Sequence, residues 1–144
     1  MRIRGFEKLN EGATLPKRST KHSAGYDICA FNDCLVKKGE VTLIYTGICA
    51  YMQDDEYLAI FIRSSLAIKR GLTLANNVGI IDSDYYHNPD NQGEIIIAVR
   101  NNTNEDILIK KGERIAQGIF MKYLKSDDDN ADFVRLGGIG STTN

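Results

Sequence analysis

The segment Gly79-Ile80-Ile81-Asp82-Ser83-Asp84-Tyr85 places two carboxylates and a phenol within four residues. On an extended strand, residues two apart point to the same face, so Asp82 and Asp84 would lie side by side. A pair of this kind can hold a metal ion or activate a water molecule. A solvated turn is the alternative, because most Asp-Ser-Asp triplets lie in turns.

Two further segments combine cations with hydroxyls or amides. Arg63-Ser64-Ser65 opens a helix-forming run, and the free backbone N–H groups of a helix start, beside a guanidinium and two hydroxyls, favour an anion. An ordinary helix cap is the alternative. Gly112-Glu113-Arg114-Ile115-Ala116-Gln117 is a turn that enters a strand. It is either part of a site or a surface hairpin whose Glu–Arg pair contributes little energy.

The end of the chain is rich in glycine. A polar hinge, residues 126–130, is followed by residues 135–142, which read Arg-Leu-Gly-Gly-Ile-Gly-Ser-Thr. Successive glycines leave backbone N–H groups free to surround an anion, with an arginine and hydroxyls alongside. A frayed terminus is the alternative interpretation.

Short strands must position these residues. Runs of strand length rich in β-branched or aromatic residues span 41–45, 57–62, 94–99 and 115–123, with turn signals at 38–40, 53–55, 101–104 and 110–112. This spacing predicts an all-β sandwich or barrel. Residues 64–70 differ: helix formers, two cations in the last turn and Gly71 as a stop predict one short helix.

Length and charge limit the function. The chain has 144 residues, with 18 Lys and Arg against 19 Asp and Glu, which fits one domain and a net charge of −1. Near-zero charge argues against a general nucleic-acid binder. No apolar run approaches membrane-spanning length, and the start lacks an apolar signal core, so we expect a cytoplasmic protein with no membrane association.

The thiols predict little chemistry. Cys29, Cys34 and Cys49 show no Cys-x-x-Cys spacing, and neither His22 nor His87 lies near a cysteine pair in the sequence. This pattern speaks against a disulfide framework and against zinc. We expect three small core residues in a reducing compartment.

Taken together and in order, five segments resemble the motifs of the trimeric dUTP pyrophosphatases (dUTPases). The third, with its Gly-x-Ile-Asp-x-Asp-Tyr core, is the most specific, and the resemblance spans nearly the whole chain. The five segments are 15–18 with 23–28, then 63–65, 76–85, 112–117 and 135–142.

The resemblance implies a fold and an assembly. The fold is an all-β, jelly-roll-like barrel over residues 1–123, followed by a hinge and a flexible C-terminal arm over residues 124–144. The assembly is a homotrimer with three shared active sites. Each site takes the third motif from one chain, the first, second and fourth from another, and the arm from the remaining chain, so the arm closes over a neighbouring subunit's site.

The resemblance also implies a reaction, in which dUTP is hydrolysed to dUMP and pyrophosphate. This keeps uracil out of DNA and supplies dUMP for thymidylate synthesis. Asp82 corresponds to the base that activates water for in-line attack on the α-phosphate, and Asp27 contacts Mg²⁺ through water while the phosphates hold the ion. The residues implied in phosphate binding are Arg63, Ser64, Ser65, Gln117, Arg135, Gly140, Ser141 and Thr142. Those implied in uracil and deoxyribose binding are Asn76, Gly79, Ile81, Tyr85 and Ile139, with residues 76–85 expected as a β-hairpin that reads uracil through backbone groups.

Two features depart from the family pattern. Ile139 stands where the arm usually carries an aromatic residue, and residues 86–92 are inserted after Tyr85. The inserted loop is a harmless surface loop, the simpler interpretation, or a loop that binds a partner or gates the lid.

Two alternatives stay open. A dCTP deaminase shares the fold and the Arg-Ser-Ser motif but needs a catalytic glutamate, for which Glu94 is the nearest residue and looks structural. A dUTPase-like trimer that captures a regulatory protein is the non-enzymatic alternative.

Overall fold

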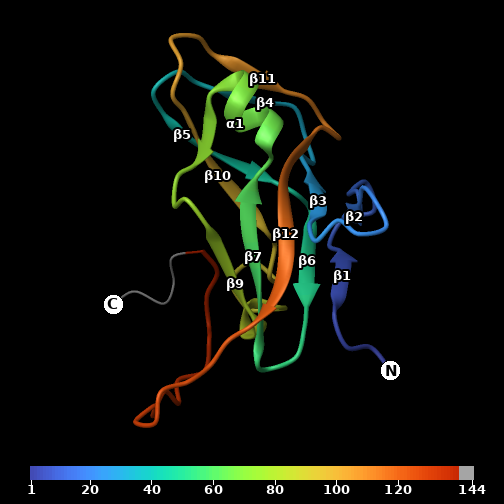
Figure 1. The fold of residues 1–144 in the computed structure, drawn as a ribbon, viewed down its shortest axis with the longest axis vertical. Coiled ribbons are helices and arrows are strands. Elements are labelled where there is room, and N and C mark those ends of the chain that lie inside the picture. The colour runs from blue at the N-terminus through green and yellow to red at the C-terminus, as the bar shows by residue number, and fades with distance from the viewer. Residues whose placement is uncertain (140–144) are drawn as a thin grey trace.

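The structure is a computed structural model that describes residues 1–139 (Figure 1). One α-helix, α1 (Ser64–Arg70), and one 3-10 helix, η1 (Ser83–Tyr85), occur in this range among strands. The strands are β1 (Gly5–Lys8), β2 (Lys17–Arg18), β3 (Tyr26–Cys29), β4 (Cys34–Val36), β5 (Val41–Tyr45), β6 (Ile48–Tyr51), β7 (Glu56–Ile62), β8 (Leu72–Leu74), β9 (Gly79–Asp82), β10 (Ile96–Asn101), β11 (Ile107–Ile109) and β12 (Arg114–Lys122).

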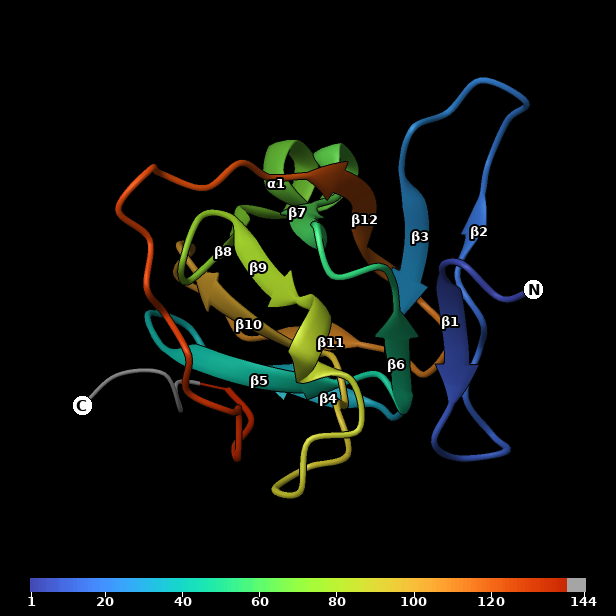
Figure 2. The ribbon, with the colours of Figure 1, turned by 90° about the horizontal axis from the view of Figure 1, so that it is seen from below.

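The strands pair antiparallel in four sheets within the described residues. The largest has the order β2-β3-β12-β7-β9, and a second has the order β5-β10-β8. The pairs β1-β6 and β11-β4 complete the wall. Figure 2 shows β9 and β7 on one side of the barrel-like body, with β10 and β5 on the other.

A single apolar core joins the two larger sheets. Leu58 and Ile60 of β7 and Ile97 and Val99 of β10 are all buried and belong to the same cluster. Along β10, buried residues alternate with more exposed ones, as expected for a strand with one face on the core. The sheets therefore form a rigid frame for the residues at their edges.

The all-β prediction with one short helix is confirmed. The helix spans the predicted residues and ends at Gly71, whose φ of 66° is the left-handed conformation that glycine adopts most easily. β5 has the predicted bounds, and β7 and β12 each begin one residue earlier than predicted. β10 begins at Ile96 instead of Glu94, because the N–H of Ile95 is already bonded to the carbonyl of Ile48.

The predicted hairpin over residues 76–85 is wrong in its pairing. β8 and β9 flank the turn but do not pair with each other: β8 pairs with β10, and β9 pairs with β7. The chain also leaves the extended conformation after Asp82 and enters η1. Asp82 and Asp84 are therefore not successive residues on one face of a strand.

The described part of the arm leaves β12 and returns to the body near β9 (Figure 1). The division at residue 123 stays a prediction. Within residues 1–139, every helix is too short or too polar to cross a membrane.

Candidate active site in two halves

A pocket of about 250 Å³ lies against β9. Gly79, at the start of β9, makes it possible for the strand to lie close to β7, because a Cβ there would come within 3.0 Å of the Ile60 Cβ. The pocket is lined by Asp82 together with all five residues predicted to bind uracil and deoxyribose: Asn76, Gly79, Ile81, Tyr85 and Ile139.

Tyr85 forms a fixed wall of this pocket. Its side chain is buried, and its hydroxyl donates a hydrogen bond to the carbonyl of Glu94 at 2.6 Å. The same hydroxyl accepts a hydrogen bond from Nδ2 of Asn91 at 2.9 Å. With donor and acceptor both engaged, the ring presents an apolar surface to whatever binds beside it.

Arg135 of the arm joins the two aspartates. Its Nη2 donates to Oδ2 of Asp82 at 2.6 Å, and its Nε donates to Oδ1 of Asp84 at 2.7 Å. The guanidinium is only 9% exposed, whereas the Asp82 side chain is 51% exposed. Burial raises the pKa of the Asp82 carboxyl, Arg135 acts to lower it, and the like charge of Asp84 raises it.

A second pocket gathers the residues of the first, second and fourth motifs. Register explains the meeting, because Asp27 of β3 lies directly opposite Gln117 of β12. Gly25 lies against the Gln117 side chain, and a Cβ there would collide with its amide oxygen. The lining residues are Ser19, Ser23, Gly25, Asp27, Arg63, Ser64, Ser65 and Gln117.

Asp27 is the single carboxylate lining this pocket. The Ser19 hydroxyl donates to its Oδ2 at 2.6 Å, and the Arg114 guanidinium lies 3.4 Å from the same oxygen. The Nε of Arg63 lies 3.6 Å from Oδ1. Two guanidinium groups around one carboxylate leave the pocket with an excess of positive charge, which suits an anion.

The two pockets are far apart within one chain. β3 and β9 are separated by β12 and β7, and Asp27 and Asp82 align with Phe61 and Tyr57, four residues apart on β7. Ideal strand spacing and rise then place the two aspartates about 20 Å apart. The pockets share no lining residue.

The structure therefore divides the predicted site residues into two groups. Arg135, predicted to bind phosphate, lies with Asp82, and Ile139 lies in the same pocket. Asp27, Arg63, Ser64, Ser65 and Gln117 form the other group. Gly140, Ser141 and Thr142 lie outside the described residues.

Four residues that contact the site were not predicted as members of it. Arg114 and Asp84 lie inside quoted motifs, so their motif positions were available as a signal. Ser19 and Asn91 gave none, because their contacts join residues that only the fold brings together.

The inserted loop is built around Asn88, which is buried. Its Oδ1 accepts hydrogen bonds from the N–H groups of Asp90 and Asn91, and its Nδ2 donates to the carbonyl of Tyr85. Asp90 in turn accepts a hydrogen bond from the N–H of Gly138 at 3.1 Å. The insertion thus lies between Tyr85 and the arm instead of standing apart as a surface loop.

Comparison with known proteins agrees with this arrangement. The dUTPase family model matches residues 11–142. A deoxyuridine 5'-triphosphate nucleotidohydrolase from Lactococcus lactis is 51% identical over 148 residues, covering 99% of each chain. The protein of the same name from Rickettsia canadensis is 44% identical over 145 residues, covering 95% of this chain and 94% of its own.

Solved structures show the same fold. The crystal structure of a dUTPase from Streptococcus mutans has a TM-score of 0.81 and 45% identity, covering 85% of this chain and 98% of its own. A dUTPase from phage phi11 of Staphylococcus aureus, with 19% identity, has a TM-score of 0.78 and covers 92% of this chain and 98% of its own. From its motifs, its fold and these relatives, the chain belongs to the dUTPase family.

Proposed function

We propose that the protein hydrolyses dUTP to dUMP and pyrophosphate in a homotrimer whose active sites each combine both pockets. The observation that carries this proposal is the division of the site: a pocket with a carboxylate and apolar walls lies about 20 Å from a pocket with cations and hydroxyls. One nucleoside triphosphate needs both kinds of surface at once. Juxtaposing two subunits supplies them, with the base in one pocket and the phosphates in the other.

In this mechanism Asp82 accepts a proton from a water molecule. That water attacks the α-phosphorus in line, and pyrophosphate leaves. The guanidinium of Arg135, bonded to Asp82 without substrate, exchanges the carboxylate for a phosphate oxygen when dUTP binds, which frees the base. Arg63, Ser64, Ser65 and Gln117 of the facing subunit bind the phosphates and stabilise the charge that develops on them.

The second pocket suits a magnesium ion that arrives with its own anions. Asp27 is flanked by Arg63 and Arg114, so direct ligation of a bare dication there would meet two positive charges. A contact through a metal-bound water fits better, with the phosphates as the main ligands, which is the usual habit of Mg²⁺. When bound, Mg²⁺ supplies neutralisation of the triphosphate charge. The phage phi11 enzyme was described with a structural Mg(II) ion, which is consistent with a metal-dependent family.

The pocket beside β9 accounts for selectivity. Uracil lies against the backbone of residues 76–82, where the amino group of cytosine would leave matched groups unpaired, a mismatch that can cost on the order of 10⁴-fold. The tight turn refuses the thymine methyl group. The buried ring of Tyr85 packs against deoxyribose and leaves no space for a 2′-hydroxyl. We place this activity in the cytoplasm, where it limits uracil in DNA and provides dUMP.

The test is hydrolysis of dUTP, dCTP, dTTP and UTP in parallel with Mg²⁺, measuring dUMP, pyrophosphate and ammonia. Rapid cleavage of dUTP alone is expected. Ammonia from dCTP would indicate a deaminase instead. Against that alternative, the Glu94 carboxylate accepts a hydrogen bond from the N–H of Gly47 at 2.9 Å and lines neither half of the site. A folded trimer inactive on all four nucleotides would favour the binding-protein alternative.

The acid limb of the kcat/KM profile for dUTP should report Asp82. The base must be deprotonated, and burial raises its pKa, so activity should fall on acidification at a pH above the ordinary aspartate value of about 3.9. Asp84→Asn removes a like charge and should move this limb to lower pH. Arg135→Gln removes an opposite charge and should move it to higher pH. Shifts in the same direction would contradict the assignment, since ionisation of the substrate is common to all three proteins.

Replacing Ile139 by phenylalanine should tighten dUTP binding. Ile139 lines the pocket and is 53% exposed, so a ring fits there and can stack on the base. Base–aromatic stacking of about 1–3 kcal/mol corresponds to roughly 5- to 150-fold in affinity. Calorimetry with a non-hydrolysable dUTP analogue measures it, and Ile139→Leu controls for apolar area. Equal affinity of the Phe and Leu variants would show that no stacking occurs.

A further inference from the structure

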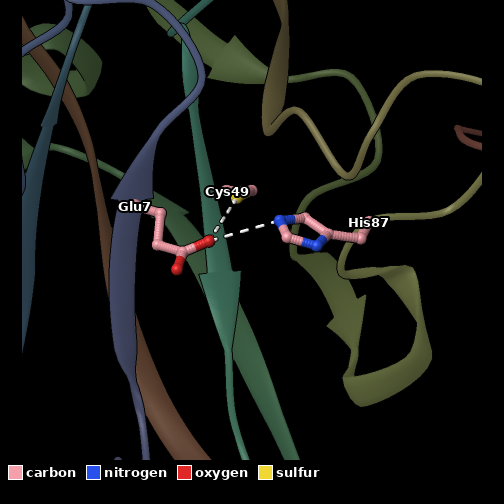
Figure 3. A group of neighbouring side chains, drawn as sticks. All are labelled: Glu7, Cys49 and His87. Carbon is pink, nitrogen blue, oxygen red and sulfur yellow. Dashed lines mark hydrogen bonds and ion pairs between the residues drawn. The ribbon is translucent and has the colours of Figure 1, made fainter.

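A cluster of three potential metal ligands lies outside both halves of the site (Figure 3). Glu7 of β1 and Cys49 of β6 are directly opposite in the antiparallel register, so their side chains share one face. His87 comes from the inserted loop and points its imidazole at them. Among residues 1–139, this is the one group of three or more His, Cys, Asp or Glu side chains whose ligand atoms converge.

The geometry points to a zinc site formed by Glu7, Cys49 and His87. The Nε2 of His87 lies 3.2 Å from Oε1 of Glu7, and Sγ of Cys49 lies 3.9 Å from the same oxygen. All three ligand atoms lie within 4.8 Å of one another. Tetrahedral zinc with bonds of 2.0–2.3 Å separates its ligand atoms by about 3.3–3.7 Å, so shifts of a few tenths of an ångström in the printed pairs suffice.

The donor set selects the metal. One sulfur, one imidazole and one carboxylate suit zinc, whereas Mg²⁺ and Ca²⁺ prefer oxygen alone. The thiol of Cys49 would lose its proton to solvent on binding, and with the Glu7 carboxylate would balance the dication. Cys49 is fully buried but His87 is 54% exposed, so the site is reached from solvent and a water can take the fourth position.

Surrounding groups orient these ligands. The hydroxyl of Tyr86 donates to Oε1 of Glu7 at 2.7 Å, and its ring stacks on the imidazole of His87 at 3.7 Å between centroids. Arg2 donates to the other Glu7 oxygen at 2.6 Å, which leaves a single carboxylate oxygen for the metal. Partners of this kind fix the direction of metal ligands in proteins.

The backbone of the inserted loop is shaped to present His87. His87 has a φ of 54°, and its N–H donates to the carbonyl of Gln92 at 3.2 Å. Gly93 closes the loop at φ 87°, where a Cβ would lie 2.8 Å from the backbone N of His87. Bound zinc would tie this loop to β1 and β6, and the same loop contacts Tyr85 and Gly138.

The test uses the full-length, tag-free protein, stripped with a chelator and titrated with Zn²⁺ or Co²⁺ in Mg²⁺ buffer. We expect about one zinc per chain by metal analysis and a thiolate-to-cobalt charge-transfer band. A zinc concentration 100-fold above Kd should raise Tm by roughly 5–10 °C. His87→Asn, which tolerates positive φ, should weaken binding at least about tenfold. Cys49→Ala should abolish the charge-transfer band.

The chain offers matched controls in His22 and Cys34, which lie outside the cluster. His22→Asn and Cys34→Ser should bind zinc as the unmodified protein does. Absence of the charge-transfer band in the unmodified protein would overturn the proposal. So would zinc affinity that is unchanged in His87→Asn, or lost to the same extent in His22→Asn. All of these readouts are independent of dUTP hydrolysis.

Discussion

Replacing Asp82 by asparagine is expected to lower kcat for dUTP hydrolysis by about 10²- to 10⁴-fold, the usual contribution of a positioned base. Asparagine keeps the size of the side chain and still lines the pocket beside Tyr85, so binding of dUTP should persist. Pre-steady-state and steady-state release of pyrophosphate, with a separate equilibrium measurement of nucleotide binding, distinguish the two effects.

Asp84→Asn is the matched control for this experiment. Asp84 has the same charge, a similar exposure of 58% and the same arginine partner, but it does not line the pocket. Its replacement should leave kcat within severalfold of the unmodified enzyme at neutral pH. Equal losses in both variants would show that the arginine contact, and not proton transfer at Asp82, limits the reaction.

Complementation between two inactive variants is the second large effect. Asp82→Asn disables one half of the site and Gln117→Ala disables the other, and each half lies in a different pocket. If every site joins pockets from neighbouring subunits, random mixed trimers should recover about a quarter of the unmodified activity, since each intact half is present with probability one half. Each variant alone should remain nearly inactive.

The mixed trimers are best made by co-expressing two differently tagged chains and purifying on both tags in sequence. Mixing the finished homotrimers without subunit exchange is the negative control and should show no recovery. A pair that disables the same pocket, Asp27→Asn with Gln117→Ala, should also stay inactive. Activity that never recovers in well-folded mixed trimers would mean that both halves of a site belong to one chain.

Much of the fold followed from local sequence. The helix at 64–70 was predictable because its formers, its two terminal cations and its stop at Gly71 all act within one or two turns. β5 was predictable for the same reason, since a β-branched run lies between turn residues. The start of β10 was not, because the N–H of Ile95 is engaged by Ile48, which is distant in sequence.

The sequence by itself also determined the chemical groups of the candidate site. Asp82, Tyr85, Arg63 and Gln117 were found from residue type and spacing within short motifs, and all line pockets in the structure. Motif residues need only local backbone geometry to be identified, so a single sequence contains that information.

Only the tertiary structure decided which groups meet. Strand register put Asp27 beside Gln117 and carried both about 20 Å from Asp82, which no local pattern encodes. The sequence pattern argued against zinc, yet register pairs Glu7 with Cys49, and the inserted loop brings His87 to them. The physical reason is that propensity and turn chemistry act over a few residues, whereas contacts across a sheet depend on the packing of the entire core.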